Sequence, residues 1–226
     1  MDEARWLSET NLTVLLLHAE GAVGERKLRL LSVAYCRGLN ELLGDVDRRA
    51  LDVAERYADG EVSERTLRRA GERVRAEAAE LSPFPFTPAA RDVNAAVWCA
   101  VALPRRTCDS VQLTQAAAMR VQLAIQAVRL PDEHERNAYW KHYADVFRDV
   151  AGYPFRPVTL HPRWQSETVV ALATGIYADR AFDRLPVLAD ALEEAGCDNR
   201  DLLAHCRGPG PHVRGCWAVD LLLGKA

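Results

Sequence analysis

Residues with metal-ligand chemistry gather near the C-terminal end of this 226-residue chain. Cys197, Cys206, His212 and Cys216 fall within twenty residues, and His205 can take the place of Cys206. Four cysteine or histidine ligands can close a tetrahedral zinc site. The segment has no Cys-x-x-Cys pair, however, and structural zinc sites usually space their paired ligands closely. Small cysteines packed in a core, with His212 at a helix start, explain the same pattern without a metal.

A second interpretation of the same segment concerns its charge. His205, Arg207, His212 and Arg214 surround the Gly-Pro-Gly-Pro run at 208–211, which forms a rigid corner. The free N–H groups of a helix that starts there would favour an anion or an acidic peptide partner. An ordinary solvated corner is the alternative.

Nucleophilic catalysis has the right residue types here but lacks supporting signals. Cys206 lies close in sequence to His205 and His212, as a thiol and its base would. No oxyanion-hole signal or third member accompanies them, and the chain has no Walker, Gly-x-Gly-x-x-Gly, Gly-x-Ser-x-Gly or His-Glu-x-x-His motif. His134 and His142 stand two helical turns apart, a spacing more typical of exposed polar residues than of paired ligands. The sequence therefore assigns no catalytic residue.

Three helical segments must position these side chains. Residues 185–195 are amphipathic, Gly196 suits a left-handed helix end, and 199–206 predict a short second helix. Residues 212–223 are apolar on nearly every side, which predicts a buried last helix with Pro211 at its first position.

The last segment also contains residues with predicted structural roles. Trp217 is expected to anchor the final helix in the core. Asp220 lies among apolar side chains and requires a partner, so a structural ion pair is the first interpretation and a functional acid the second. Gly210 is expected to take a conformation open chiefly to glycine, and Pro211 to set the entry into the helix.

The tail resembles a known family. The runs LADALEEAGC, HCRGPGPHVRGCW and VDLLLGK resemble the tail of a large paralogous family of uncharacterised bacterial proteins. The run ERKLRLLSVAYCR resembles the front end of the same family, in which a second cysteine often stands at the position of Tyr35. The resemblance covers roughly the first sixty and the last seventy-five residues. It implies one compact helical unit, and it implies no activity, cofactor or catalytic residue.

Composition is that of an ordinary soluble protein, with 49% hydrophobic and 27% charged residues. The net charge of −3 creates no global field for nucleic acid, and the arginines within 63–81 are interleaved with glutamates. No segment is apolar for long enough to span a membrane, and the first residues do not resemble a secretory signal. Six scattered cysteines are then expected to be reduced, which predicts a cytoplasmic location.

Helical periodicity runs through the whole chain, and alternating strand patterns are absent from the sequence. We therefore expect an all-α fold, an irregular bundle of about nine or ten helices without a sheet. The predicted organisation is a single helical domain with two halves, 1–81 and 89–226, joined by the proline-rich segment 82–88. The long irregular stretch 152–164 is expected to be pinned by its aromatic residues.

Two functional hypotheses follow from these patterns. The first is a non-enzymatic helical protein-interaction or scaffold module, because the sequence predicts helices throughout, has a near-neutral charge and shows no set of catalytic residues. The alternative is a metal- or anion-binding protein with its site at the Cys206, His212 and Cys216 corner, where zinc is the expected metal.

Overall fold

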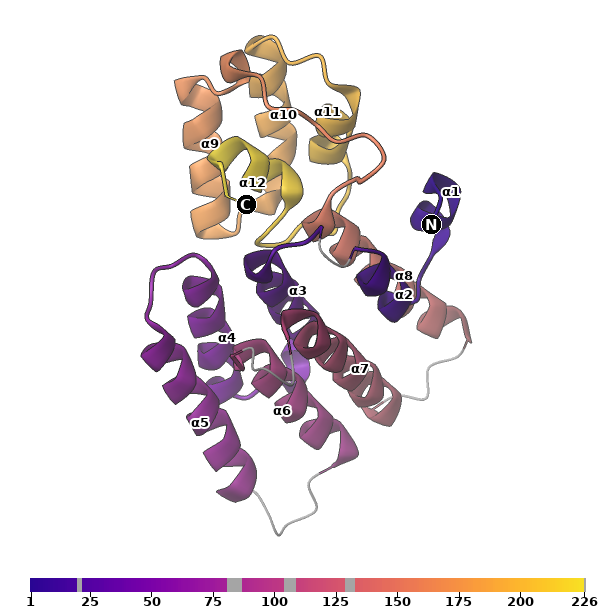
Figure 1. Cartoon of the computed structure of the whole chain (residues 1–226), viewed down its shortest axis with the longest axis vertical. Coiled ribbons are helices and arrows are strands. Elements are labelled where there is room, and N and C mark those ends of the chain that lie inside the picture. Colours follow the sequence, from indigo (N-terminus) through magenta and orange to yellow (C-terminus); the bar gives the residue numbers. More distant parts are fainter. Residues whose placement is uncertain (20–21, 81–86, 104–108, 129–132, 226) are drawn as a thin grey trace. The chain divides into compact units, whose positions relative to one another are not determined.

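The computed structural model describes residues 1–19, 22–80, 87–103, 109–128 and 133–225. These residues form twelve α-helices and three short 3-10 helices and contain no strand, which confirms the all-α class (Figure 1). The count exceeds the nine or ten predicted because several helices have only six or seven residues. The helices are α1 (Glu3–Ser8), α2 (Leu12–His18), α3 (Glu25–Arg37), η1 (Asn40–Leu42), α4 (Asp45–Ala58), α5 (Glu64–Glu80), α6 (Pro88–Val101), α7 (Ser110–Val128), α8 (Glu133–Ala151), η2 (Pro162–Trp164), α9 (Glu167–Asp179), η3 (Phe182–Arg184), α10 (Leu185–Glu194), α11 (Arg200–Arg207) and α12 (Trp217–Leu223).

The chain divides into two compact units, Met1–Ala144 and Asp145–Ala226, and the division falls inside α8. The sequence predicted a division at 82–88 instead. Residues 81–86 lie outside the described residues, and α5 and α6 on either side of them pack against each other within the first unit.

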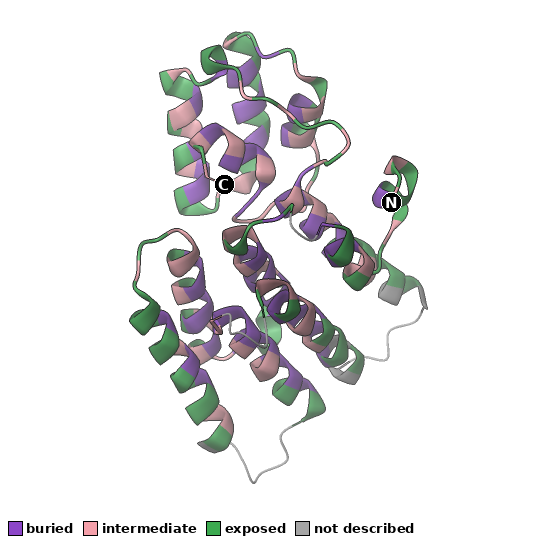
Figure 2. Cartoon of the chain, viewed as in Figure 1, coloured by how far each residue is buried: buried purple, intermediate pink, exposed green. Residues whose placement is uncertain are grey.

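The first unit is built around α3, which packs against α4, α6 and α7, while α5 covers α4 and α6. Figure 2 colours the ribbon by burial and shows buried residues alternating with exposed ones along these helices. Leu67 and Val74 are fully buried on α5, a helix that otherwise presents charged residues to solvent. The narrow apolar stripe of α5 is therefore sufficient to pack it against its neighbours, since tertiary packing stabilises a helix more than its own propensity does.

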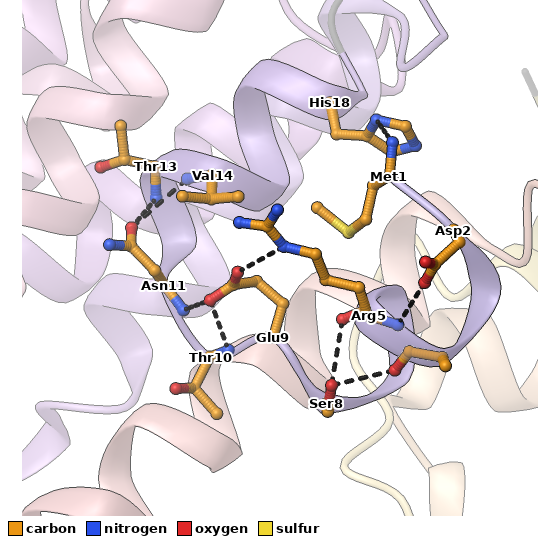
Figure 3. Close-up of polar contacts among 11 residues, drawn as sticks. Met1, Asp2, Arg5, Ser8, Glu9, Thr10, Asn11, Thr13, Val14 and His18 are labelled. Carbon is orange, nitrogen blue, oxygen red and sulfur yellow. Dashed lines mark hydrogen bonds and ion pairs between the residues drawn. The ribbon is translucent and has the colours of Figure 1, made fainter.

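The N-terminal corner of this unit is held by polar contacts to backbone groups (Figure 3). The Glu9 carboxylate accepts hydrogen bonds from the backbone N–H of Thr10 at 3.1 Å and of Asn11 at 2.9 Å. The Asn11 side chain in turn accepts from the first N–H groups of α2. Asn11 is thus the cap that satisfies donors left open at a helix start.

The second unit packs α12 against α9 and α11, and α10 against α9 and α11. Ala218, Val219 and Leu222 of α12 are buried in its core, and Asp220 is only 1% exposed. The Gln165 side-chain amide donates to the Leu222 carbonyl at 2.9 Å and satisfies one carbonyl at the end of α12. The last helix is therefore a core element, as its apolar pattern predicted, with Trp217 half-buried at its start.

The start of that helix differs from the prediction. Helix α12 begins at Trp217 and not at His212, and Pro211 lies in the preceding loop. Gly215 has φ 98°, a left-handed conformation that interrupts a right-handed helix. The Val213 N–H donates to the Asp149 carboxylate of α8, which holds the loop before α12.

The irregular stretch before α9 is pinned as predicted. Tyr153 and Phe155 make an edge-to-face contact with ring centroids 5.7 Å apart, and Trp164 is buried in the core of the second unit. Aromatic contacts of this kind hold a long loop without secondary structure.

Candidate metal centre

Four side chains of the second unit meet at one point between α8, α11 and the loop before α12. Asp149 comes from the last turn of α8, His205 from the last turn of α11, and His212 and Cys216 from the loop. One ligand atom from each, a carboxylate oxygen, two ring nitrogens and a sulfur, lies within 4.8 Å of every other. These four residues could together hold a metal ion and are called the metal cluster below.

Asp149 is the hub of the metal cluster. Its side chain is 2% exposed, and its Oδ1 lies 2.8 Å from His212 Nδ1 and 3.2 Å from His205 Nε2. Its Oδ2 accepts a hydrogen bond from the Val213 backbone N–H at 2.9 Å. Burial acts to raise the pKa of this carboxyl, but its hydrogen bonds to His205 and His212 and its electrostatic interactions with them outweigh burial and lower the pKa. The carboxylate is therefore ionised.

Both ring nitrogens of His212 face acceptors. Nδ1 lies against Asp149, and Nε2 is 3.3 Å from the Gly208 carbonyl oxygen. Both nitrogens then carry protons, because an unprotonated nitrogen would point a lone pair at an oxygen. Burial acts to lower the pKa of His212, but the hydrogen bond and charge of Asp149 raise it. Asp149 and His212 thus form a buried ion pair.

His205 has a different proton arrangement. The Trp217 indole Nε1–H donates to His205 Nδ1 at 3.1 Å, so this nitrogen presents its lone pair. The proton of the neutral ring is then on Nε2, directed at Asp149 Oδ1 and at Cys216 Sγ, which is 3.2 Å away. The His205 ring also packs against the rings of His212 and Trp217, each with a centroid distance of 4.8 Å.

Cys216 is fully buried. Its burial and, to a smaller extent, the nearby charge of Asp149 raise the pKa of its thiol. It therefore carries its proton at neutral pH when no cation is present. In a nucleophile triad the base contacts the nucleophile with one nitrogen and the orienting acid with the other. Here Cys216 and Asp149 both contact Nε2 of His205. The geometry does not match that of a catalytic thiol.

The remaining residues singled out from the sequence lie elsewhere. Cys197 and Cys206 are buried outside the metal cluster, and burial raises the pKa of Cys206 to about 12. Arg207 pairs with Asp190 and Glu193, and Arg214 stacks over a tyrosine ring, so these arginines do not join the histidines as one cationic rim. His134 and His142 are exposed on α8.

Sequence reasoning missed Asp149, the residue that joins the two histidines. One signal was available. Asp149 stands between the apolar residues Val146 and Val150 on a helix, close to the C-terminal end, where the helix dipole disfavours a carboxylate. An inward-facing acid in that position requires compensating donors from elsewhere in the chain.

Comparisons with protein-family models, with curated proteins and with solved structures gave no match to this chain. The family resemblance of the tail therefore stays a prediction. No helix in the described part of the chain has both the length and the apolar character that crossing a bilayer requires.

Gly210 sets the course of the loop that carries His212. Its φ is +83°, and a Cβ added there would lie 2.9 Å from the His212 backbone nitrogen and 3.1 Å from its ring. We expect Gly210→Ala to destabilise the second unit by roughly 1–3 kcal/mol, because the change adds left-handed strain to a backbone clash. Urea unfolding with hydrogen exchange of residues in α11 and α12 measures the loss.

A matched control for Gly210→Ala is Gly175→Ala in α9. No atom lies within 4 Å of the added Cβ there, and alanine favours a helix over glycine. This variant should be as stable as the parent or more so. Equal stability of both variants would show that the corner at Gly210 tolerates a side chain.

Proposed function

We propose that the second unit binds a divalent metal of the zinc class through Asp149, His205, His212 and Cys216. The observation that supports this is the convergence of four ligand atoms within 4.8 Å in a site of which Asp149 and Cys216 are buried. A tetrahedron with zinc bonds of about 2.0–2.3 Å has edges of about 3.3–3.8 Å. The ligand atoms therefore need to move by about an ångström or less to enclose the ion. The protein-interaction role expected from the sequence stays a prediction beside this one.

The donor set favours zinc over other common ions. Two imidazoles, one thiolate and one carboxylate combine borderline and soft ligands, which suit zinc and neighbouring transition metals. Calcium and magnesium prefer sites made of oxygen alone. Four protein ligands would complete the coordination sphere, which is typical of a structural zinc site and leaves no open position for a substrate.

The arrangement described above is the protonated form of the same site. Zinc requires a thiolate, so Cys216 must release its proton, and His212 must release the proton on Nδ1. After that release the His212 Nε2–H still donates to the Gly208 carbonyl. Metal-bound histidines commonly hold such an acceptor with their second nitrogen, and it fixes the ring as a ligand. His212 is thus oriented for a metal.

The test is stoichiometric zinc binding by the full chain, purified without a histidine tag and titrated against a zinc-binding dye. We expect one equivalent to bind to the parent, and cobalt substituted for zinc to show thiolate-to-metal charge-transfer absorption. Cys216→Ala should lose that absorption and weaken zinc binding at least about a hundredfold, since it removes a ligand. Neither signal in the parent protein would refute the proposal.

Cys206→Ala is the matched control for Cys216→Ala. It removes a thiol that is equally buried and that lies outside the metal cluster. Both variants remove one buried sulfur atom and lower stability by a similar mechanism. Zinc affinity should stay at the parent's value in Cys206→Ala. Equal loss in both variants would show that the effect comes from damage to the core and not from the loss of a ligand.

A further inference from the structure

Building on the proposed metal site, we infer that Trp217 lowers its metal affinity. The indole N–H donates to His205 Nδ1, the nitrogen that must carry the proton when His205 binds a metal through Nε2. The two histidines of the metal cluster differ in what their second nitrogens face. His212 Nε2 faces an acceptor, the Gly208 carbonyl oxygen at 3.3 Å. His205 Nδ1 faces a donor, the Trp217 indole N–H at 3.1 Å.

This difference determines which tautomer each ring can hold. A neutral imidazole bound to a metal through Nε2 carries its proton on Nδ1. For His205 that proton would point at the Trp217 N–H, so two donors would face each other across 3.1 Å. Metal entry therefore breaks the indole hydrogen bond and displaces the Trp217 side chain, whereas His212 keeps its second bond.

Neither Trp217 nor His205 is fully buried. Trp217 is half-buried and is the first residue of α12, and the His205 side chain is 19% exposed. A Cβ placed on Gly152 would lie 3.3 Å from the Trp217 Cβ, so Gly152 allows close packing against Trp217. Trp217 thus acts as a positioning residue that stabilises the metal-free tautomer of His205.

Trp217→Phe removes the indole N–H and keeps an aromatic ring, although a smaller one. We expect zinc affinity to rise about tenfold in this variant, the factor that corresponds to one hydrogen bond of about 1.4 kcal/mol. A structural role alone would not raise the affinity, because the loss of packing would weaken the site. Competition titration with the zinc-binding dye measures the change.

Trp164→Phe is the matched control for Trp217→Phe. Trp164 is buried in the same unit, and its indole N–H has no hydrogen-bond partner among the described residues. Its replacement removes an indole without removing a bond to the metal cluster, so zinc affinity should not change. Equal zinc affinity in the parent and in Trp217→Phe, or weaker binding in Trp217→Phe, overturns the inference and leaves the proposed metal site intact. Absence of zinc binding in all three proteins overturns both.

A measurement on the parent protein needs no substitution. In nitrogen-15 spectra of the metal-free protein, His205 Nδ1 should show the shift of an unprotonated nitrogen that accepts a hydrogen bond. Addition of zinc should move the proton to Nδ1 and speed the exchange of the Trp217 indole N–H with solvent. An indole N–H that exchanges equally slowly with and without zinc would contradict the inference even if Trp217→Phe fails to fold.

Discussion

Replacement of Asp149 by alanine is expected to lower the free energy of unfolding of the second unit by about 3–5 kcal/mol. The carboxylate accepts from two histidines and one backbone N–H, and all three donors would remain without their acceptor. Removing one partner of a buried ion pair has effects of this size, because the other charge stays in a medium that solvates it poorly. Urea unfolding, with hydrogen exchange of residues in α11 and α12 to separate the two units, measures the loss.

Asp190→Ala is the control for this experiment. Asp190 pairs with Arg207 at 2.9 Å, but its side chain is 70% exposed. Exposed pairs of this kind contribute about 0–1 kcal/mol, so the variant should unfold close to the parent. A loss below about 1 kcal/mol for Asp149→Ala as well would show that the metal-free cluster contributes little to stability.

Zinc affinity is expected to depend steeply on pH. Each proton that zinc displaces adds a factor of about ten in affinity per pH unit. Cys216 supplies one such proton at any ordinary pH because the pKa of its thiol is raised, and His212 supplies a second below its own raised pKa. Affinity should therefore rise about a hundredfold per unit below the His212 pKa and about tenfold above it. Competition titrations from about pH 5 to about pH 8 measure both slopes.

The stability of the metal-free protein should fall, and not rise, with increasing pH over part of this range. The lowered pKa of Asp149 contributes stability that is present above its ordinary value of 3.8 and is lost as pH falls through the folded pKa. The raised pKa of His212 contributes stability that is complete below its ordinary value of 6.5 and is lost as pH rises through the folded pKa. The ion pair is thus most stabilising between these two values.

For the zinc titrations, an affinity that does not change with pH would rule out the displacement of both protons.

Local rules predicted the helices well because their signals lie within a few residues of one another. The cap at Asn11 and the left-handed helix end at Gly196, with φ 80°, both follow from single residues at the edge of an apolar pattern. The buried character of α12 likewise follows from its composition. The late start of α12 was not predicted, because it depends on the left-handed conformation that Gly215 takes, with φ 98°.

The candidate site shows the same contrast. His212 and Cys216 could be named from their residue types, and the structure places both in the metal cluster. Cys197 and Cys206 have the same chemistry but lie outside it, because their positions in the core are set by the packing of α10 and α11. No local pattern joins Asp149 to the tail, since tertiary packing alone brings it there.

Asp149 and His212 are 63 residues apart in the chain. The entropy lost on closing a loop grows with the logarithm of its length, so closing this contact costs more entropy than closing a short local one. A metal held by both ends would act as a cross-link around α9, α10 and α11, much as a disulfide restricts an unfolded chain. Removal of the metal with a chelator would then loosen α9, α10 and α11, although His205 is the single ligand that these helices contribute. A synthetic peptide of the tail would lack the Asp149 carboxylate.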